Sequence, residues 1–186
     1  MKSNSVRWYA GFLVAAFSAT LVMTPGISSA QKGKAMELHI CSLLTEGDVA
    51  PIVGAGQISQ ETKGGRSCMW GDPGNNPNKP RLLIQAPNFT QGASPDLRRT
   101  DTTTEERVEA SFKANRKQAF DDKGSHAKDE PQLGKAAFSA LTDDGVEILI
   151  MKKNVLLNIQ YLTGKQGTPE NLEAIRKAAG KVAASF

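Results

Sequence analysis

Apolar residues recur at every second position from Val146 to Tyr161, and the polar residues 152–154 divide this run near its middle. A period of two is typical of β-strands, so the run predicts two antiparallel strands. Before it, the mostly apolar residues 136–141 lead into residues 143–145, Asp-Asp-Gly, which favour a tight hairpin turn. The C-terminal half therefore predicts three consecutive strands. Both of their faces carry apolar side chains, so we expect part of this sheet to be covered twice.

A second hairpin is predicted nearer the N-terminus. Residues 66–71 form a short strand pattern that places Cys68 and Trp70 on the same face, and residues 81–86 form another. Between them lie residues 72–80, which are rich in proline, asparagine and glycine and are expected to form a loop.

Three helices are predicted, each beginning at a threonine cap: residues 45–53, interrupted by Pro51; residues 103–119; and residues 168–186. The polar residues 121–134 predict a surface loop. The element order is therefore helix, two strands, helix, three strands, helix. This order predicts an α+β fold in which an antiparallel sheet of about five strands packs with three helices as a sandwich.

Residues 1–30 have the layout of a cleavable secretion signal. Lys2 and Arg7 precede residues 8–23, which carry no charge, and small residues lead to a cleavage point after Ala30. The sequence thus predicts export to the periplasm or the extracellular space. We expect residues 31–40 to be a flexible N-terminal segment and residues 41–186 to be a single α+β domain.

Composition changes this interpretation little. The chain has 186 residues, of which 39% are hydrophobic and 23% charged, an ordinary globular mixture. Removing the signal leaves 21 basic and 19 acidic residues, and these are interspersed rather than gathered on one stretch. Nucleic-acid binding requires clustered basic residues, so nucleic acid is not an expected partner.

Cys41 and Cys68 are the two cysteines of the chain, and export exposes them to an oxidising compartment. We therefore expect them to form a disulfide. The alternative is a metal site in which His39 and His126 join the two cysteines, although no spacing typical of zinc ligands is present. No small residue precedes Cys41 as in a lipobox, so no stable membrane anchor is expected after signal cleavage.

Several short motifs resemble a family of small actinobacterial lipoproteins and secreted proteins of unknown function. They are Cys41–Thr45, Asp48–Val49, Gly54, Gly65–Trp70 and Leu133–Phe138. The resemblance implies a disulfide-tied α+β fold in the bacterial envelope, akin to the sandwich of the PsbP-like proteins. It implies no chemistry.

Candidate functional residues are few. Trp70 is a candidate binding residue, although a tryptophan so close to a disulfide cysteine is more often packed on the bridge. The sequence contains no nucleophile–base motif, phosphate loop or calcium loop, so it predicts no catalytic residues, no cofactor and no metal. These observations favour an exported, non-enzymatic binding or accessory domain whose partner is an unidentified envelope protein or small ligand.

Two alternatives remain open at the level of sequence. The first is a secreted hydrolase that uses carboxylates among Asp121, Asp122 and Asp143, although both acidic pairs lie in turn-like segments. The second is an inhibitor of a secreted enzyme, with the loop at residues 72–80 as the inserting element.

Overall fold

Seven strands form one antiparallel sheet in the part of the chain that the structure, a computed structural model, describes: residues 39–62, 64–72, 76, 79–89, 103–134 and 136–186. The strands are β1 (Ile58–Glu61), β2 (Ser67–Gly71), β3 (Arg81–Gln85), β4 (Lys128–Asp129), β5 (Ala137–Thr142), β6 (Gly145–Lys152) and β7 (Val155–Leu162). Their order across the sheet is β1-β2-β3-β7-β6-β5-β4. The predicted secretion signal lies outside the described residues, as does most of the predicted flexible segment.

In the part of the chain that the structure describes, three α-helices and three 3-10 helices accompany the sheet. The α-helices are α1 (Glu46–Val53), α2 (Thr104–Asp121) and α3 (Pro169–Ala184), and the 3-10 helices are η1 (Ile40–Leu43), η3 (Lys123–Ser125) and η4 (Pro131–Leu133). Each α-helix begins with a capping box, formed by Thr45 with Asp48, Thr103 with Glu106 and Thr168 with Asn171. These reciprocal contacts satisfy backbone N–H groups that have no partner within the helix, which explains why the helices start where they do.

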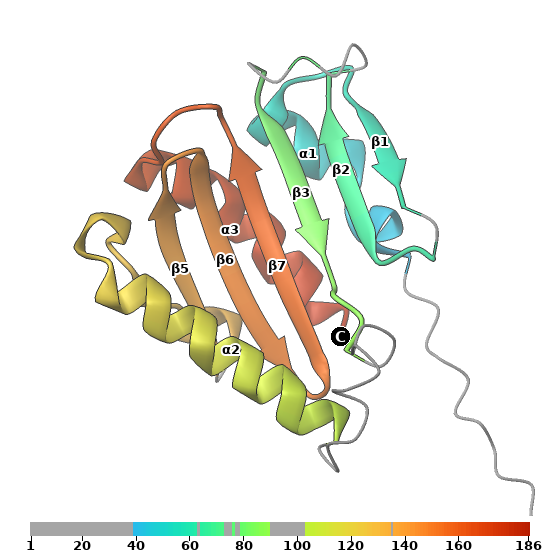
Figure 1. Cartoon of the computed structure of the whole chain (residues 1–186). Coiled ribbons are helices and arrows are strands. Elements are labelled where there is room, and N and C mark those ends of the chain that lie inside the picture. Colours follow the sequence, from blue (N-terminus) through green and yellow to red (C-terminus); the bar gives the residue numbers. More distant parts are fainter. Residues whose placement is uncertain (1–38, 63, 73–75, 77–78, 90–102, 135) are drawn as a thin grey trace, which may run out of the picture. The chain divides into compact units, whose positions relative to one another are not determined.

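The helices divide between the two faces of the sheet. Helices α1 and α3 lie on one face, and α2 crosses the other face over β5, β6 and β7 (Figure 1). The predicted double covering of the C-terminal strands is therefore present. Among the described residues, no helix covers the α2 face of the sheet over β1, β2 and β3.

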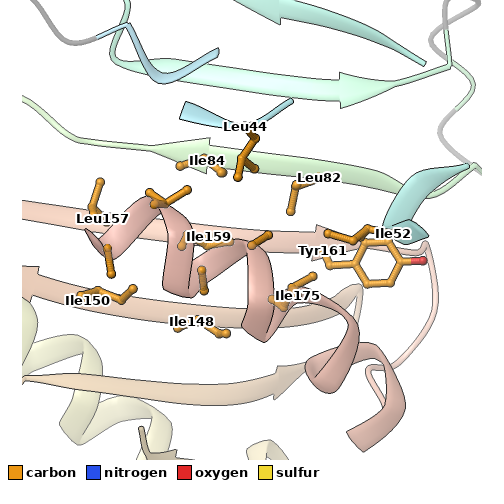
Figure 2. Packing of buried hydrophobic residues seen from close by; sticks show 14 of the residues in the cluster. Leu44, Ile52, Leu82, Ile84, Ile148, Ile150, Leu157, Ile159, Tyr161 and Ile175 are labelled. Atoms are coloured by element: carbon orange, nitrogen blue, oxygen red, sulfur yellow. The ribbon is translucent and has the colours of Figure 1, made fainter. Parts of the chain in front are cut away.

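The larger core lies between the sheet and helices α1 and α3 (Figure 2). Every second residue of β6 and β7 points into it, because successive side chains of a strand face opposite sides. Ile148, Ile159 and Ile175 are fully buried there. A smaller cluster lies under α2, where Phe112 meets Phe138 edge to face with ring centroids 5.6 Å apart.

The fold class is α+β, as predicted, and the three predicted helices and five predicted strands are present. The expected number of strands was too low, because the described residues form seven. Strand β1 was missed because all four of its side chains are exposed, so no period-two burial pattern marks it. Strand β4 has only two residues, Lys128 and Asp129, and both are exposed.

The prediction of a surface loop over residues 121–134 was wrong. This segment contains η3, β4 and η4, and it buries Ser125, Glu130 and Leu133. Two of these residues are polar, so composition alone favoured a solvated loop, whereas in the structure hydrogen bonds satisfy both side chains.

Candidate functional site

A polar cavity of about 360 Å³ lies between the end of α2, η3 and the β5–β6 hairpin. Three carboxylates, those of Asp122, Asp143 and Glu147, contribute to its lining, together with neutral polar groups that include the amide of Gln166. No lysine or arginine lines it among the described residues. The cavity therefore offers hydrogen-bond acceptors and negative charge to whatever enters it.

Glu147 reaches this cavity from the third position of β6. It lies opposite Ala140 of β5 and Gln160 of β7, so the three side chains form one row on the α2 face of the sheet. Burial raises the pKa of the Glu147 carboxyl, and a hydrogen bond with the side chain of Gln160 offsets part of that rise. A half-buried carboxyl of this kind can accept a hydrogen bond or, when protonated, donate one.

Asp122 forms the wall of the cavity at the end of α2. Its Oδ1 accepts a hydrogen bond from the backbone N–H of Gly124 at 2.9 Å and thereby caps η3. The carbonyl oxygens of Ala119 and Asp122 both lie within hydrogen-bonding distance of the buried hydroxyl of Ser125, which ties η3 back onto α2. These bonds hold this wall in one conformation.

Gln166 is placed by an unusually close approach of two glycines. The backbone N–H of Gly167 donates to the carbonyl of Thr142 at 2.9 Å, which holds the segment before α3 against the β5–β6 hairpin. A Cβ atom at Gly167 would lie only 1.8 Å from the carbonyl oxygen of Gly145, so no larger residue fits this contact. Gln166 directly precedes Gly167, so this contact places Gln166 in the lining of the cavity.

The structure separates the carboxylates that the sequence grouped as candidates. Asp122 and Asp143 line the same cavity, although they are 21 positions apart in the chain. Asp121 does not line the cavity and pairs with Lys117 one helical turn away. Sequence reasoning missed Glu147, although one signal was present: it is the single acidic residue inside the apolar strand β6.

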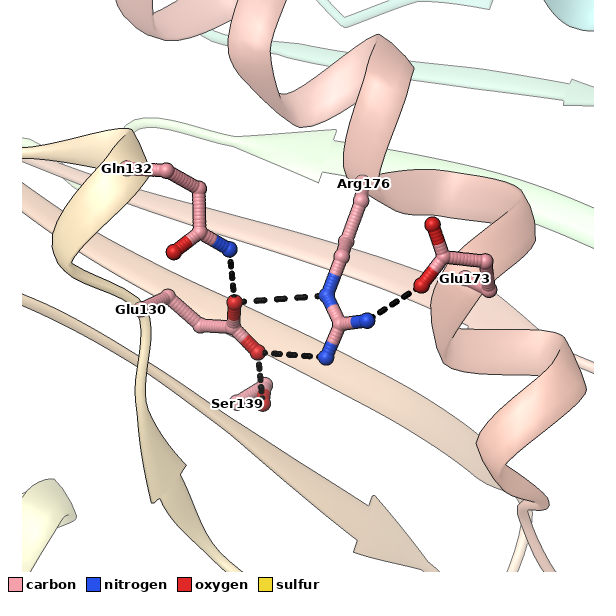
Figure 3. A network of polar contacts seen from close by, with 5 residues as sticks. All are labelled: Glu130, Gln132, Ser139, Glu173 and Arg176. Atoms are coloured by element: carbon pink, nitrogen blue, oxygen red, sulfur yellow. Dashed lines mark hydrogen bonds and ion pairs between the residues drawn. The ribbon is translucent and has the colours of Figure 1, made fainter.

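A buried ion pair fixes the segment that follows η3 (Figure 3). Glu130, only 2% exposed, accepts hydrogen bonds from Ser139 at 2.6 Å and from Arg176 of α3 at 2.9 and 3.2 Å. Gln132 also donates to Glu130, and Glu173 also binds Arg176. Burial opposes the charge on Glu130, but the hydrogen bonds outweigh it and lower its pKa. This network is a satisfied structural contact, and it anchors the β4–η4 segment to α3.

Cys41 and Cys68 form a disulfide that joins η1 to β2, with their Cα atoms 5.1 Å apart. Because the cysteines are bonded to each other, the alternative metal site through His39 and His126 is not formed. Among the described residues, no three His, Cys, Asp or Glu side chains lie close enough together to hold a metal ion, and this includes the three carboxylates that line the polar cavity. Within that same part of the chain, no helix is long and apolar enough to cross a membrane.

Trp70 follows Cys68 on the same face of β2 and is 5% exposed. It lines a second, smaller cavity of about 160 Å³ beside the disulfide, together with residues of η1, α1 and β1.

The chain has few detectable similarities to known proteins. No protein-family profile matches the chain, and no curated protein matches its sequence. Among solved structures, the chain has a distant match to cyanobacterial PsbP (CyanoP) from Synechocystis sp. PCC 6803. The two are 12% identical over 71% of this chain and 81% of that chain, with a TM-score of 0.29. The α+β fold class rests on this chain's own element order and sheet topology.

Proposed function

We propose that this protein is an exported, non-enzymatic binding domain of the bacterial envelope, and that its ligand occupies the polar cavity at the end of α2. The observation that carries the proposal is the meeting of Asp122, Asp143 and Glu147 in one cavity whose described lining contains no basic side chain. Ligand sites combine a cavity with a few converging polar groups, and this cavity has both.

The charge of the lining favours a small organic cation with hydrogen-bond donors. Asp143 is exposed at the mouth of the cavity, where its carboxylate can attract a positive group, whereas Glu147 lies deeper on the sheet. The amide of Gln166 and the hydroxyl of Thr142 line the same space and supply neutral hydrogen-bonding groups.

Two further observations support a location outside the cytoplasm. The disulfide Cys41–Cys68 is typical of proteins in an oxidising compartment. The resemblance of residues 41–45 and 65–70 to actinobacterial envelope proteins agrees with the secretion signal that the sequence predicts.

A matched series of small probes tests the proposal. Benzylamine, benzyl alcohol and benzoate differ mainly in charge, and their binding to the exported protein can be compared by saturation-transfer NMR. We expect benzylamine to bind best, Asp143→Asn to weaken it, and Asp144→Asn to leave it unchanged, because Asp144 lies in the same turn but does not line the cavity. Equal binding of all three probes, or equal effects of the two variants, would contradict the proposal.

A secreted hydrolase is the second candidate, and Glu147 is the observation that favours it. A carboxyl with a raised pKa in a cavity that other carboxyl groups also line is an arrangement that general acid catalysis uses. Under this alternative Glu147 would donate the proton, and Asp122 or Asp143 would act as base. The alternative requires turnover of p-nitrophenyl esters, glycosides or phosphates that Glu147→Gln abolishes, whereas the binding proposal predicts none.

A further inference from the structure

Strand β1 forms one edge of the sheet, and among the described residues only β2 pairs with it (Figure 1). In an antiparallel ladder, the backbone groups of alternate residues point toward the neighbouring strand and away from it. The N–H of Thr62 donates to the carbonyl of Ser67 at 3.0 Å, so the even-numbered residues of β1 bond to β2. The backbone N–H and C=O groups of Ser59 and Glu61 therefore point outward from the edge.

The two edges of the sheet differ in how they are protected against pairing with another strand. The opposite edge, β4, is only two residues long and carries Lys128, and both short length and lysine discourage pairing. Strand β1 has four residues and contains no proline, lysine or arginine. Its one charged side chain, that of Glu61, accepts from the backbone N–H of Cys41 at 3.3 Å and lies 3.4 Å from His39. The β1 edge is therefore the more open of the two.

Ile58 gives this edge an apolar side chain that nothing covers. It is 42% exposed and is one of two large hydrophobic residues so exposed in the described part of the chain. Its partner on β2 is Gly71, which has no side chain to shield it. Ile58 and Gln60 point to the face opposite Ser59, which pairs with the buried Trp70. A strand added to this edge would lie beside Ile58 and cover it.

We propose that two copies of this chain associate edge to edge, with β1 of one copy antiparallel to β1 of the other. Such a pair is two-fold symmetric, so each strand must be complementary to itself. With Gln60 opposite Gln60 of the second copy, Ser59 of each strand faces Glu61 of the other. All the outward backbone groups of β1 then form hydrogen bonds between the copies, and Ile58 lies beside Thr62 of the second copy.

Charge favours this register. No like charges face each other in it, whereas pairing centred on Glu61 would place two carboxylates directly opposite, which is unfavourable. Pairing over so short a strand buries little surface, so we expect a reversible dimer whose population depends on concentration. The inference is independent of the cavity at the end of α2, which is lined from β5 and β6 rather than from β1.

Sedimentation velocity of the exported protein over a range of concentrations tests the pairing through Ser59→Pro. Proline removes the outward N–H of Ser59, and the bonds to β2 remain because that N–H does not contribute to them. Two hydrogen bonds are lost in each dimer by symmetry, so we expect dimerisation to weaken at least about tenfold. Ser59→Ala keeps the N–H and is the matched control, which should dimerise like the wild type. Thermal unfolding checks that both variants are folded.

A charge swap at Gln60 tests the register. Gln60→Lys alone and Gln60→Glu alone each place like charges at the two-fold axis and should dimerise up to about fivefold more weakly. An equal mixture of the two variants places opposite charges there, and native mass spectrometry should show mixed dimers in excess of either homodimer. Hydrogen exchange should show the Ser59 and Glu61 amides gaining protection as the wild-type concentration rises, with Gln60 protected throughout by its bond to β2.

Three results would overturn the proposal. The first is a wild-type chain that stays monomeric at about 1 mM, where even weak complexes are half formed. The second is a dimer that survives Ser59→Pro, or charge variants that associate no better together than alone. The third is a monomeric chain whose Ser59 and Glu61 amides gain protection only when the peptide acetyl-Thr-Val-Thr-Val-Thr amide is added, which would assign this edge to a strand of another protein.

Discussion

Glu130 and Arg176 meet as a two-pronged ion pair although they are 46 positions apart in the chain: Nη2 of Arg176 lies 2.9 Å from Oε1 of Glu130, and Nε lies 3.2 Å from Oε2. The Glu130 side chain is almost fully buried, whereas the Arg176 side chain is 22% exposed. This pair attaches the segment after η3 to α3 across the edge of the sheet (Figure 3). Glu130 lies five residues after η3, which forms one wall of the candidate cavity.

Replacing Arg176 by alanine should destabilise the protein by roughly 3–5 kcal/mol, because it leaves the Glu130 charge buried without its partner. Lys177→Ala is the matched control, since its side chain is exposed on the next position of α3. Urea unfolding followed by circular dichroism measures both free energies of unfolding. Similar losses in the two variants would show that the ion pair contributes little.

Removing the disulfide should cost roughly 2–5 kcal/mol, whether by Cys41→Ala, Cys68→Ala or both together. The first helix is only eight residues long and contains Pro51, so little else holds this region to the sheet. Hydrogen exchange should therefore show η1 and α1 loosening before the β6–β7 hairpin. Free, alkylatable thiols in the exported protein, or uniform loosening of both regions, would contradict this prediction.

Glu147→Gln should stabilise the protein at neutral pH. The folded state raises the pKa of Glu147, so folding favours the protonated carboxyl, and this contribution is lost as the pH rises from the ordinary value of 4.5 through the raised pKa. Glutamine cannot ionise, so the stability difference between variant and wild type should shrink as the pH falls below about 4.5. Thermal unfolding of both proteins across this pH range measures the difference in stability. A difference that does not change with pH would contradict the raised pKa of Glu147.

Gly167→Ala should destabilise the protein by about 1–3 kcal/mol or more, because the added Cβ would lie 1.8 Å from the carbonyl oxygen of Gly145 and the backbone must move apart. The movement also displaces Gln166, so benzylamine binding should weaken. Gly180→Ala is the control. Gly180 lies inside α3, where alanine is more favourable than glycine, and the added Cβ would lie 3.8 Å from the side chain of Leu133, an ordinary contact distance. Comparable stability of the two variants would contradict the close contact.

The sequence predicted those parts of the fold whose local pattern matches their environment. Strands β6 and β7 alternate regularly because one face is buried in the large core, and the threonine caps mark all three α-helices. Strand β1 carries no such mark, since its edge position leaves every side chain exposed.

The candidate cavity was only partly predictable, because it is formed by segments that are distant in the sequence. Asp122 and Asp143 were recognisable as acidic residues in turns, but their proximity depends on how α2 packs against the β5–β6 hairpin. Glu147 was taken as one position of an alternating strand, and its partial burial depends on Gln160 of the neighbouring strand and on the end of α2. Likewise, the burial of Glu130 requires Arg176, which only the folded chain brings to it.

A map of backbone amide shifts on titrating benzylamine into the isotope-labelled, exported protein tests the binding proposal most directly. We expect the largest shifts on Thr142, Glu147 and Gln166, which line the cavity from the β5–β6 hairpin and from the segment before α3. In Asp143→Asn the same residues should respond at higher benzylamine concentration. Shifts scattered over the surface, or centred on residues that do not line this cavity, would contradict the proposed binding at this cavity.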